Sequence, residues 1–228
     1  MQYHRIIISA ILIITLSIFT QGCFRHHHNY EDSESIIGSG RTVSEERVVQ
    51  PCQSVQIVGS AKVYLTQGTH QSIRVEADDN IIDRVVTRCE NGYLIVGLEE
   101  GSYTNTTVRV YVTLTTIENL EIIGAGDITT TNPIHCDAVK CRIEGAGNIS
   151  LDGSASTQTI FIDGAGNISN FGLVSSVCTA TINGTGNCEV HVTQQLNAEI
   201  NGVGSIVYEG NPPVVNKTVN GIGKIYPH

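Results

Sequence analysis

The C-terminal half of the chain has a hydrophobic and polar pattern that repeats about every 20 residues. Two positions in each repeat are almost always β-branched, and polar and apolar residues alternate around them. The first position holds Ile122, Ile143, Ile162, Ile182, Ile200 and Val219. The second holds Ile128, Ile149, Ile168, Cys188, Ile206 and Ile225. Alternation with a period of two predicts strands, and like residues at like positions predict strands that stack around one interior.

Between these two positions a Gly-x-Gly phrase returns six times. Its glycines are Gly124, Gly126, Gly145, Gly147, Gly164, Gly166, Gly184, Gly186, Gly202, Gly204, Gly221 and Gly223. The first glycines of successive phrases lie 21, 19, 20, 18 and 19 residues apart. Self-similarity at this period predicts a β-solenoid, in which each repeat buries its apolar face only against its neighbours. Each phrase is predicted to be a strand, a glycine-assisted bend and a second strand.

The glycines have a structural interpretation. A bend needs backbone conformations that a Cβ disfavours, and close stacking of coils leaves little room for side chains. The alternative, a phosphate-binding loop, requires a Gly-Lys-Ser/Thr sequence and a following helix, and the chain has neither. A calcium-binding nonapeptide array is excluded because the period is about twice too long and only Asp127 is acidic in the matching column. We therefore predict no cofactor and no metal.

The residue before each phrase is predicted to point outward. This column reads Ile123, Glu144, Asp163, Asn183, Asn201 and Asn220. Glu144 and Asp163 would have backbones roughly 4.8 Å apart, with Glu121 and Asp127 near the first coils. Such a carboxylate pair could serve a glycoside hydrolase. The structural interpretation is a polar sheet face with an amide ladder, and no insertion or Ser, Cys or His constellation builds a catalytic site.

Four Asn-x-Ser/Thr sequons also fall mostly within the repeated phrase, at Asn148, Asn167, Asn183 and Asn216. We interpret them through turn chemistry, since Asn tolerates the left-handed conformation, and not as glycosylation sites.

The N-terminal half predicts short strands over Val55–Val58, Lys62–Thr66, Ser72–Glu76, Tyr93–Leu98 and Thr107–Val112. Gly68, Asp78 to Asn80 and Asn91-Gly92 supply turns between them, and residues 80–89 could form a short helical turn. Residues 57–63 look like a degenerate copy of the later phrase. We expect one domain over residues 41–228, with irregular coils at 41–117 and regular Gly-x-Gly coils at 118–228.

Residues 1–22 predict a targeting segment. A short basic start precedes 14 apolar residues, too few for a membrane-spanning helix, which needs about 20. Residues 20–23 then resemble a bacterial lipobox, which implies cleavage before Cys23 and a diacylglycerol on its sulfur. Thr20 departs from the usual Leu, and a plain secretory signal is the alternative. Phe24 stands where an inner-membrane retention signal would have Asp, so we expect an outer-membrane location in a cell that has one.

Residues 23–40 predict a flexible tether, because they offer little to bury. His26, His27 and His28 could bind a transition metal, but adjacent histidines on a flexible arm seldom form a fixed site.

The charge and the aromatic content of the chain limit the classes of molecule that it can bind. Without Arg5 the mature chain has 12 basic and 22 acidic residues, a balance of −10, so nucleic acid is excluded as a partner. There is no tryptophan, and aromatic residues make up 5% of the chain. If Cys23 carries lipid, six cysteines remain, which are Cys52, Cys89, Cys136, Cys141, Cys178 and Cys188. They allow 15 pairings, and the sequence does not choose among them, although Cys141 and Cys188 suit small apolar core positions.

The chain resembles the family of putative auto-transporter adhesin head domains called the GIN domain. The resemblance rests on residues 55–68, 73–82, 91–95 and 110–114 together with the Gly-x-Gly-Asp/Asn-Ile phrase, and it covers residues 48–225. It implies a parallel β-helix-like fold on secreted or lipid-anchored proteins, and it carries over no catalytic residue. The chain departs from the family at Cys52, where the family tends to have an aromatic residue. Cys52 could form a stabilising disulfide with Cys89.

We therefore expect a non-enzymatic, lipid-anchored envelope protein that binds a protein or glycan ligand in an adhesin-like or scaffolding role. The alternatives are a carbohydrate-active β-helix enzyme that uses Glu144 and Asp163, and a structural lipoprotein that forms homo-oligomers through exposed solenoid ends.

Overall fold

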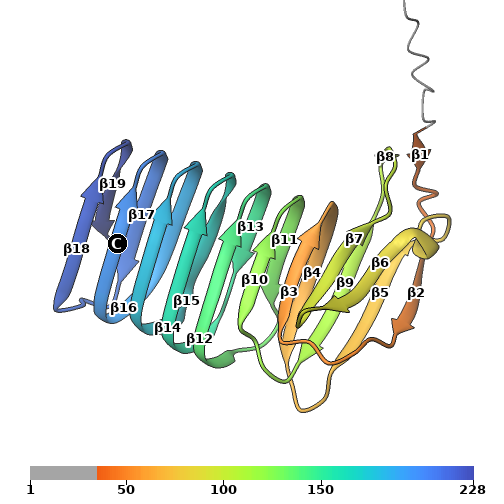
Figure 1. The fold of residues 1–228 in the computed structure, drawn as a ribbon, viewed down its shortest axis with the longest axis horizontal. Helices are drawn as coiled ribbons and strands as arrows, with labels where there is room; N and C mark the ends of the chain where they lie inside the picture. Colours follow the sequence, from red (N-terminus) through yellow and green to blue (C-terminus); the bar gives the residue numbers. More distant parts are fainter. Residues whose placement is uncertain (1–34) are drawn as a thin grey trace, which may run out of the picture. The chain divides into compact units, whose positions relative to one another are not determined.

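The computed structural model describes residues 35–228, which form a parallel β-solenoid (Figure 1). Most coils contribute one strand to each of two parallel rows, which we call row A and row B. The Gly-x-Gly bend leads from the row A strand of a coil to its row B strand. The predicted all-β solenoid with repeats of about 20 residues is confirmed. Within residues 35–228, no helix has the length and apolar character needed to cross a membrane.

Row A contains, in spatial order, β6 (Val85–Glu90), β7 (Tyr93–Leu98), β3 (Ser54–Val58), β10 (Asn119–Ile122), β12 (Ile134–Ile143), β14 (Gly153–Ile162), the second parts of β15 (Ala165–Ile182) and β16 (Thr185–Ile200), and β18 (Val214–Val219). Row B contains β2 (Thr42–Arg47), β5 (Ser72–Asp78), β9 (Val108–Leu114), β4 (Ser60–Gln67), β11 (Ala125–Thr130), β13 (Ala146–Ser150), the first parts of β15 and β16, β17 (Val203–Glu209) and β19 (Ile222–Pro227).

The two predicted apolar columns lie inside the solenoid. Ile122 pairs with Ile143, and Ile128 pairs with Ile149, so like side chains stack directly on one another. From Ile122 to Ile200 and from Ile128 to Ile206 every member of the two columns is 0% exposed. Burying each such side chain contributes about 1.5–3 kcal/mol, so these columns stabilise every coil that they cross.

The first coils do not follow the order of the chain. The β3–β4 coil lies between the β7–β9 coil and the β10–β11 coil. Within it, Ile57 pairs with Ile122 and Val63 pairs with Ile128, so residues 57–63 occupy the position of a Gly-x-Gly phrase, as predicted.

Five predicted N-terminal strands match β3, β4, β5, β7 and β9 within about two residues. The expected helical turn is a 3₁₀ helix, η1 (Ile82–Arg84), which is followed directly by β6. β2 and β6 were not predicted. They pair antiparallel with β5 and β7, so the N-terminal end of the solenoid is closed by antiparallel strands.

Residues 35–40 belong to the folded domain, so the prediction that the flexible tether extends to Gly40 was wrong. β1 (Ile36–Ile37) pairs with β8 (Tyr103–Thr104). Asn80 Nδ2 donates to the carbonyl of Ile37 at 2.8 Å, and the amide of Gly40 donates to Asp78 Oδ1 at 2.9 Å. Asp78 is only 1% exposed and also accepts from the amide of Thr107 at 2.7 Å. The buried carboxylate therefore ties three segments together.

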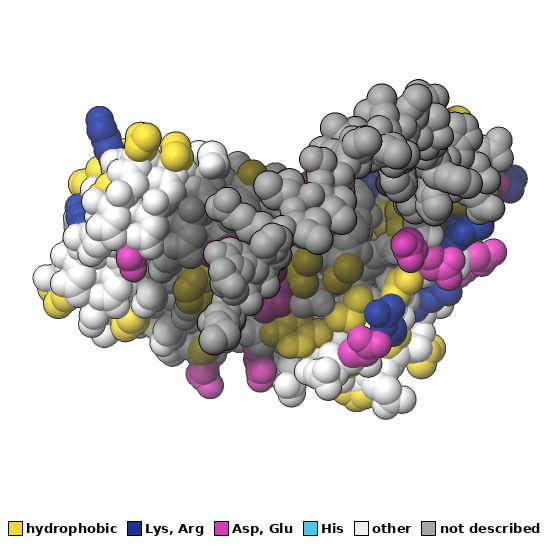
Figure 2. Space-filling view, turned by 45° about the horizontal axis from the view of Figure 1, so that its top comes forward, with side chains coloured by type: hydrophobic (Ala, Val, Ile, Leu, Met, Phe, Trp, Pro, Cys, Tyr) yellow, Lys and Arg dark blue, Asp and Glu magenta, His cyan; other side chains and the backbone are white. Residues whose placement is uncertain are grey.

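Charged side chains lie across both ends of the core. At the N-terminal end Arg47 and Glu45 form an ion pair of 2.8 Å on the inward face of β2, and Arg47 Nη2 donates to the carbonyl of Ile82 at 3.0 Å. At the other end Lys217 occupies the inward column of Ala198 and folds over Tyr208. Figure 2 shows hydrophobic side chains exposed at the end formed by the last coils.

Candidate functional site

The glycine bends stack backbone against backbone. A Cβ on Gly164 would meet the carbonyl oxygen of Gly145 at less than 3.0 Å, and one on Gly166 would meet that of Gly147 equally closely. Of the twelve phrase glycines only Gly204 has a positive φ in the restricted range, +152°. Close approach of the coils, and not a left-handed bend, therefore requires glycine at the other eleven positions. The amide of Ala165 already donates to the carbonyl of Gly145 at 2.9 Å, so the bends do not form an open phosphate cradle.

Asparagine side chains form ladders along the outside of the bends. Asn183 Nδ2 donates to Asp163 at 2.6 Å, Asn201 to Asn183 at 2.9 Å and Asn220 to Asn201 at 2.8 Å, which confirms the expected amide ladder. A second ladder joins Asn148 to Asp127 and Asn167 to Asn148 at 2.9 and 3.1 Å. The left-handed interpretation of the sequons was wrong, because the described non-glycine residues with positive φ are Asn91, Asn105 and Asn211.

Glu144 and Asp163 do lie in one outward column, as predicted, but Arg142 lies between them. Its guanidinium contacts Glu144 at 2.6 Å and Asp163 at 2.9 Å. Asp163 also accepts from Asn183. Both carboxylates are therefore paired with the same guanidinium group. They do not face each other across an open cleft, as the general acid and the base or nucleophile of a glycoside hydrolase would. Glu121 and Asp127 are likewise engaged, by Gln56 at 2.9 Å and Lys62 at 3.4 Å.

Cys52 and Cys89 form a disulfide with a Cα–Cα distance of 6.1 Å, so the crosslink expected where Cys52 departs from the family pattern is present. Cys141, Cys178 and Cys188 are free and fully buried, which agrees with the interpretation of Cys141 and Cys188 as small apolar core residues. Burial raises the pKa of the Cys141 thiol to about 12, and it also raises the pKa of Cys178 and of Cys188 well above the usual value. Cys136 is free and half-buried, and burial raises its pKa as well.

Cys23, His26, His27 and His28 lie outside the described residues. Within residues 35–228, no three His, Cys, Asp or Glu side chains are arranged to hold a metal ion.

An open groove of about 860 Å³ follows an irregularity shared by successive row A strands. Asp137 and Ser156 are skipped in the register of β12 and β14, and Ser176 is skipped between β14 and β15. Each is an unpaired residue at one corner of its coil, and the side chains of these residues line the groove. The three residues, together with Thr116, lie eight positions before the first glycine of their phrases. The shared spacing of this polar column is present in the sequence, but no apolar pattern marks it as a site.

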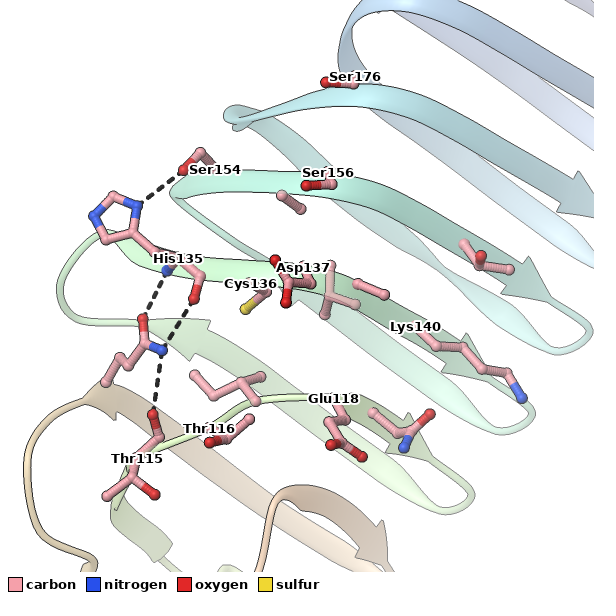
Figure 3. A pocket seen from close by; sticks show the side chains of 17 residues that line it. Thr115, Thr116, Glu118, His135, Cys136, Asp137, Lys140, Ser154, Ser156 and Ser176 are labelled. Carbon is pink, nitrogen blue, oxygen red and sulfur yellow. Dashed lines mark hydrogen bonds between the residues drawn. The ribbon is translucent and has the colours of Figure 1, made fainter.

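Hydrogen bonds fix one end of the groove (Figure 3). Gln67 accepts from the amide of His135 at 2.6 Å and donates to its carbonyl at 3.1 Å. It also reaches the carbonyl of Thr115, so it joins β4, the loop before β10 and β12. The His135 ring nitrogen Nδ1 lies 2.9 Å from Ser154 Oγ. These contacts hold the wall of the groove in place independently of any ligand.

The remaining groove side chains are rich in unused polar groups. Hydroxyl groups come from Thr116, Ser156 and Ser176, and carboxylates from Glu118 and Asp137 (Figure 3). Within the described part of the chain, neither carboxylate has an ion-pair or hydrogen-bond partner. Lys140, at the far end, also lacks an ion pair there and lies 5.7 Å from the centre of the Phe161 ring. The arrangement suits hydrogen bonding to a polar ligand.

Solved structures share this fold. A putative adhesin from Bacteroides fragilis has a TM-score of 0.72 at 20% identity, and the match covers 85% of this chain and 100% of that one. A putative lipid binding protein from Parabacteroides distasonis has a TM-score of 0.52 at 21% identity, over 86% and 100% of the two chains. A putative adhesin from the same species has a TM-score of 0.55 at 18% identity, over the same shares.

No curated protein matches the chain. The family model described as "Putative auto-transporter adhesin, head GIN domain" matches residues 52–212. The family resemblance noted from the sequence is thereby confirmed, and the family and two of these three solved structures are named as putative adhesins. The chain belongs to the family of putative auto-transporter adhesin head GIN domains.

Proposed function

We propose that this protein is a lipid-anchored, non-enzymatic binding protein of the bacterial cell envelope, and that the groove along Asp137, Ser156 and Ser176 binds a glycan. The observation that supports this most directly is the column of unpaired hydroxyl and carboxylate groups at the bent corner of successive coils. Because these groups repeat at the spacing of the coils, about 4.8 Å, they offer regularly placed partners to a chain-like ligand rich in hydroxyl groups.

The chemistry of the groove favours a neutral or weakly cationic glycan. The groove lining contains two unpaired carboxylates, Glu118 and Asp137, and one ammonium group, on Lys140. Its net charge is therefore negative, which disfavours polyanions. An acyl chain fits poorly because polar side chains dominate the lining, and burying such groups without partners is unfavourable. The lipid-binding name of one structural relative therefore gains no support from this groove.

The anchoring part of the proposal rests on the lipobox-like residues 20–23 and the apolar segment before them. Membrane fractionation with metabolic labelling by a fatty acid tests it. Label should be present on the parent and lost from Cys23→Ser, whereas an unlabelled, soluble parent would contradict lipid anchoring. Protease shaving of intact cells, with a lysed-cell control, then decides between surface and periplasmic exposure, because only a surface-exposed domain is cut before lysis.

The two other expectations receive less support. Enzymatic use of Glu144 and Asp163 would require carboxylates free to exchange protons, and Arg142 engages both. Self-association through the last coil would have to displace Lys217, whose ammonium group lies over the end of the core.

Binding of the purified full chain to an array of bacterial and host glycans tests the proposed ligand class. Ser156→Lys places a bulky cation in the groove and should weaken binding about tenfold or more, equivalent to about 1.4 kcal/mol. Gln194→Lys is the matched control, because Gln194 stands at the same repeat position but does not line the groove. The proposal is wrong if no glycan is retained by the parent, or if Ser156→Lys binds as the parent does.

A further inference from the structure

The outer face of row B changes character in the last two coils. One outward column reads Asp127, Asn148, Asn167, Asn187, Ser205 and Lys224, and the next reads Thr129, Ser150, Ser169, Glu189, Val207 and Tyr226. The ladder of amides therefore stops at Ser205, and an aromatic ring follows beside it. Tyr226 is 44% exposed, whereas most large apolar side chains of the solenoid are buried.

The end of the ladder leaves hydrogen-bonding groups unused. Asn187 donates to Asn167 Oδ1 from its backbone amide at 3.1 Å and from Nδ2 at 3.2 Å. In the earlier coils an asparagine of the following coil donates to the amide or carboxylate oxygen before it. Ser205 is too short to reach back in this way. Among the described residues, Asn187 Oδ1, Ser205 Oγ and the Glu189 carboxylate consequently have no hydrogen-bond or ion-pair partner.

These groups surround a shallow hollow of about 260 Å³. Asn187, Ser205 and Glu189 supply its polar side, and Val207 and Tyr226 supply its apolar side. The hollow is smaller than the range of about 300–1,000 Å³ that holds drug-sized ligands, so it suits one small ring and not a long chain. It lies on the outer face of row B and shares no lining residue with the groove.

We propose that this hollow is a second binding site, for a single neutral sugar ring. A pyranose has hydroxyl groups that both donate and accept hydrogen bonds, and it has one ring face made of C–H groups. The hydroxyl groups match Asn187, Ser205 and Glu189, and the C–H face matches the exposed ring of Tyr226, an amphipathic side chain suited to such half-wet contacts. The sugar occupies the space next to Asn187 that an asparagine side chain at position 205 would fill.

The charge of the hollow selects against other small ligands. Glu189 is its only charged lining residue, so a free carboxylate or phosphate is disfavoured. This site extends the proposed glycan-binding function, since a second contact on another face raises the avidity for a branched or dense glycan without strengthening the groove itself.

The test is saturation-transfer NMR and titration of the full chain with methyl glycosides of glucose, galactose, mannose and N-acetylglucosamine. At least one glycoside should bind, and Tyr226→Ala should weaken it about tenfold or more. Ser205→Asn should do the same by completing the ladder and filling the site. Thr129→Ala, an exposed change in the same column as Tyr226, is the matched control and should leave binding unchanged.

The two sites fail separately. Binding that is lost in Ser156→Lys but unchanged in Tyr226→Ala and Ser205→Asn overturns the second site and leaves the groove. Binding that is lost in Tyr226→Ala and Ser205→Asn but kept in Ser156→Lys does the reverse. If none of the four glycosides binds the parent, the second site is overturned even where the glycan array is positive. Thermal unfolding of each variant shows whether the loss reflects folding, and loss in the well-folded Ser205→Asn variant is the decisive support.

Discussion

Lys217 donates a hydrogen bond from Nζ to the carbonyl oxygen of Ile225 at 3.2 Å, so its side chain crosses from row A to row B at the open end of the core. The same ammonium group donates to Tyr208 Oη at 3.1 Å and lies 4.7 Å from the centre of its ring. Inward-pointing charges at the edge of a sheet oppose edge-to-edge pairing, because the next strand would bury them.

Lys217→Leu should therefore convert the chain into a self-associating one. The substitution removes the charge and adds an apolar side chain to the end of the core, where Val219 is already 45% exposed. Sedimentation of the parent should show monomers at concentrations at which the variant forms dimers. Lys224→Leu serves as the control, since Lys224 lies on the outer face. Equal association of both variants would show that general hydrophobicity, and not the position of Lys217, controls assembly.

Gly164→Val should destabilise the domain by about 3 kcal/mol or more, because the new side chain would collide with the backbone of the preceding coil. Chemical unfolding followed by circular dichroism measures the change. Ala165→Val is the control, since Ala165 is exposed and Val203 occupies the same column two coils later. Unfolding midpoints that coincide for the parent and Gly164→Val would mean that the coils can separate at the bends.

Asp78→Ala should release the start of the domain. It leaves the amides of Gly40 and Thr107, whose hydrogen bonds to Asp78 are part-buried, without their acceptor, which costs about 3 kcal/mol. Hydrogen exchange should then become faster at both amides, while amides in β14 to β16 keep their protection. The exposed Asp83, which has no partner among the described residues, gives the control Asp83→Asn. Unchanged exchange at Gly40 would contradict the role assigned to Asp78.

Stability should fall at alkaline pH because of the buried thiols. The pKa of Cys141 is raised to about 12 in the folded state, against about 9 for an exposed thiol, so above pH 9 only the unfolded chain loses this proton. The stabilisation is complete below pH 9 and is lost as the pH rises toward 12, at about 1.4 kcal/mol per pH unit. The free energy of unfolding, measured with urea at several pH values, should fall less steeply with pH for Cys141→Ala than for the parent. Parallel slopes would show that this thiol ionises as readily in the folded state as in the unfolded one.

The sequence predicted those parts of the fold that repeat. The isoleucine columns and the Gly-x-Gly phrases gave the solenoid, its period and the inward positions, because each coil contacts only its neighbours. The placement of the β3–β4 coil between later coils could not be predicted, since it depends on pairing between distant segments such as Val55 and Leu120. The predicted tether extended too far toward the C-terminus, to Gly40, because the contact between Gly40 and Asp78 is also non-local.

Less of the candidate sites could be predicted. Glu144 and Asp163 do share a column, but Arg142, which lies in β12 two residues before Glu144, engages both. The groove follows Asp137, Ser156 and Ser176, whose shared spacing was available in the sequence but has no apolar pattern to draw attention to it. The hollow beside Tyr226 depends on a missing amide at Ser205, and an absence in a repeat has meaning only once the ladder itself is seen.

The position of the β3–β4 coil has a consequence for how the chain grows and how the family can diversify. Leu120 pairs with Val55, 65 residues earlier, whereas each later coil closes on a partner about 20 residues away. Long closures cost more chain entropy and form more slowly, so the pairing of the N-terminal coils is the costly step, whereas each later coil closes locally. Because a later coil contacts only its neighbours, one such coil can be inserted or deleted without changing the long closure between Val55 and Leu120.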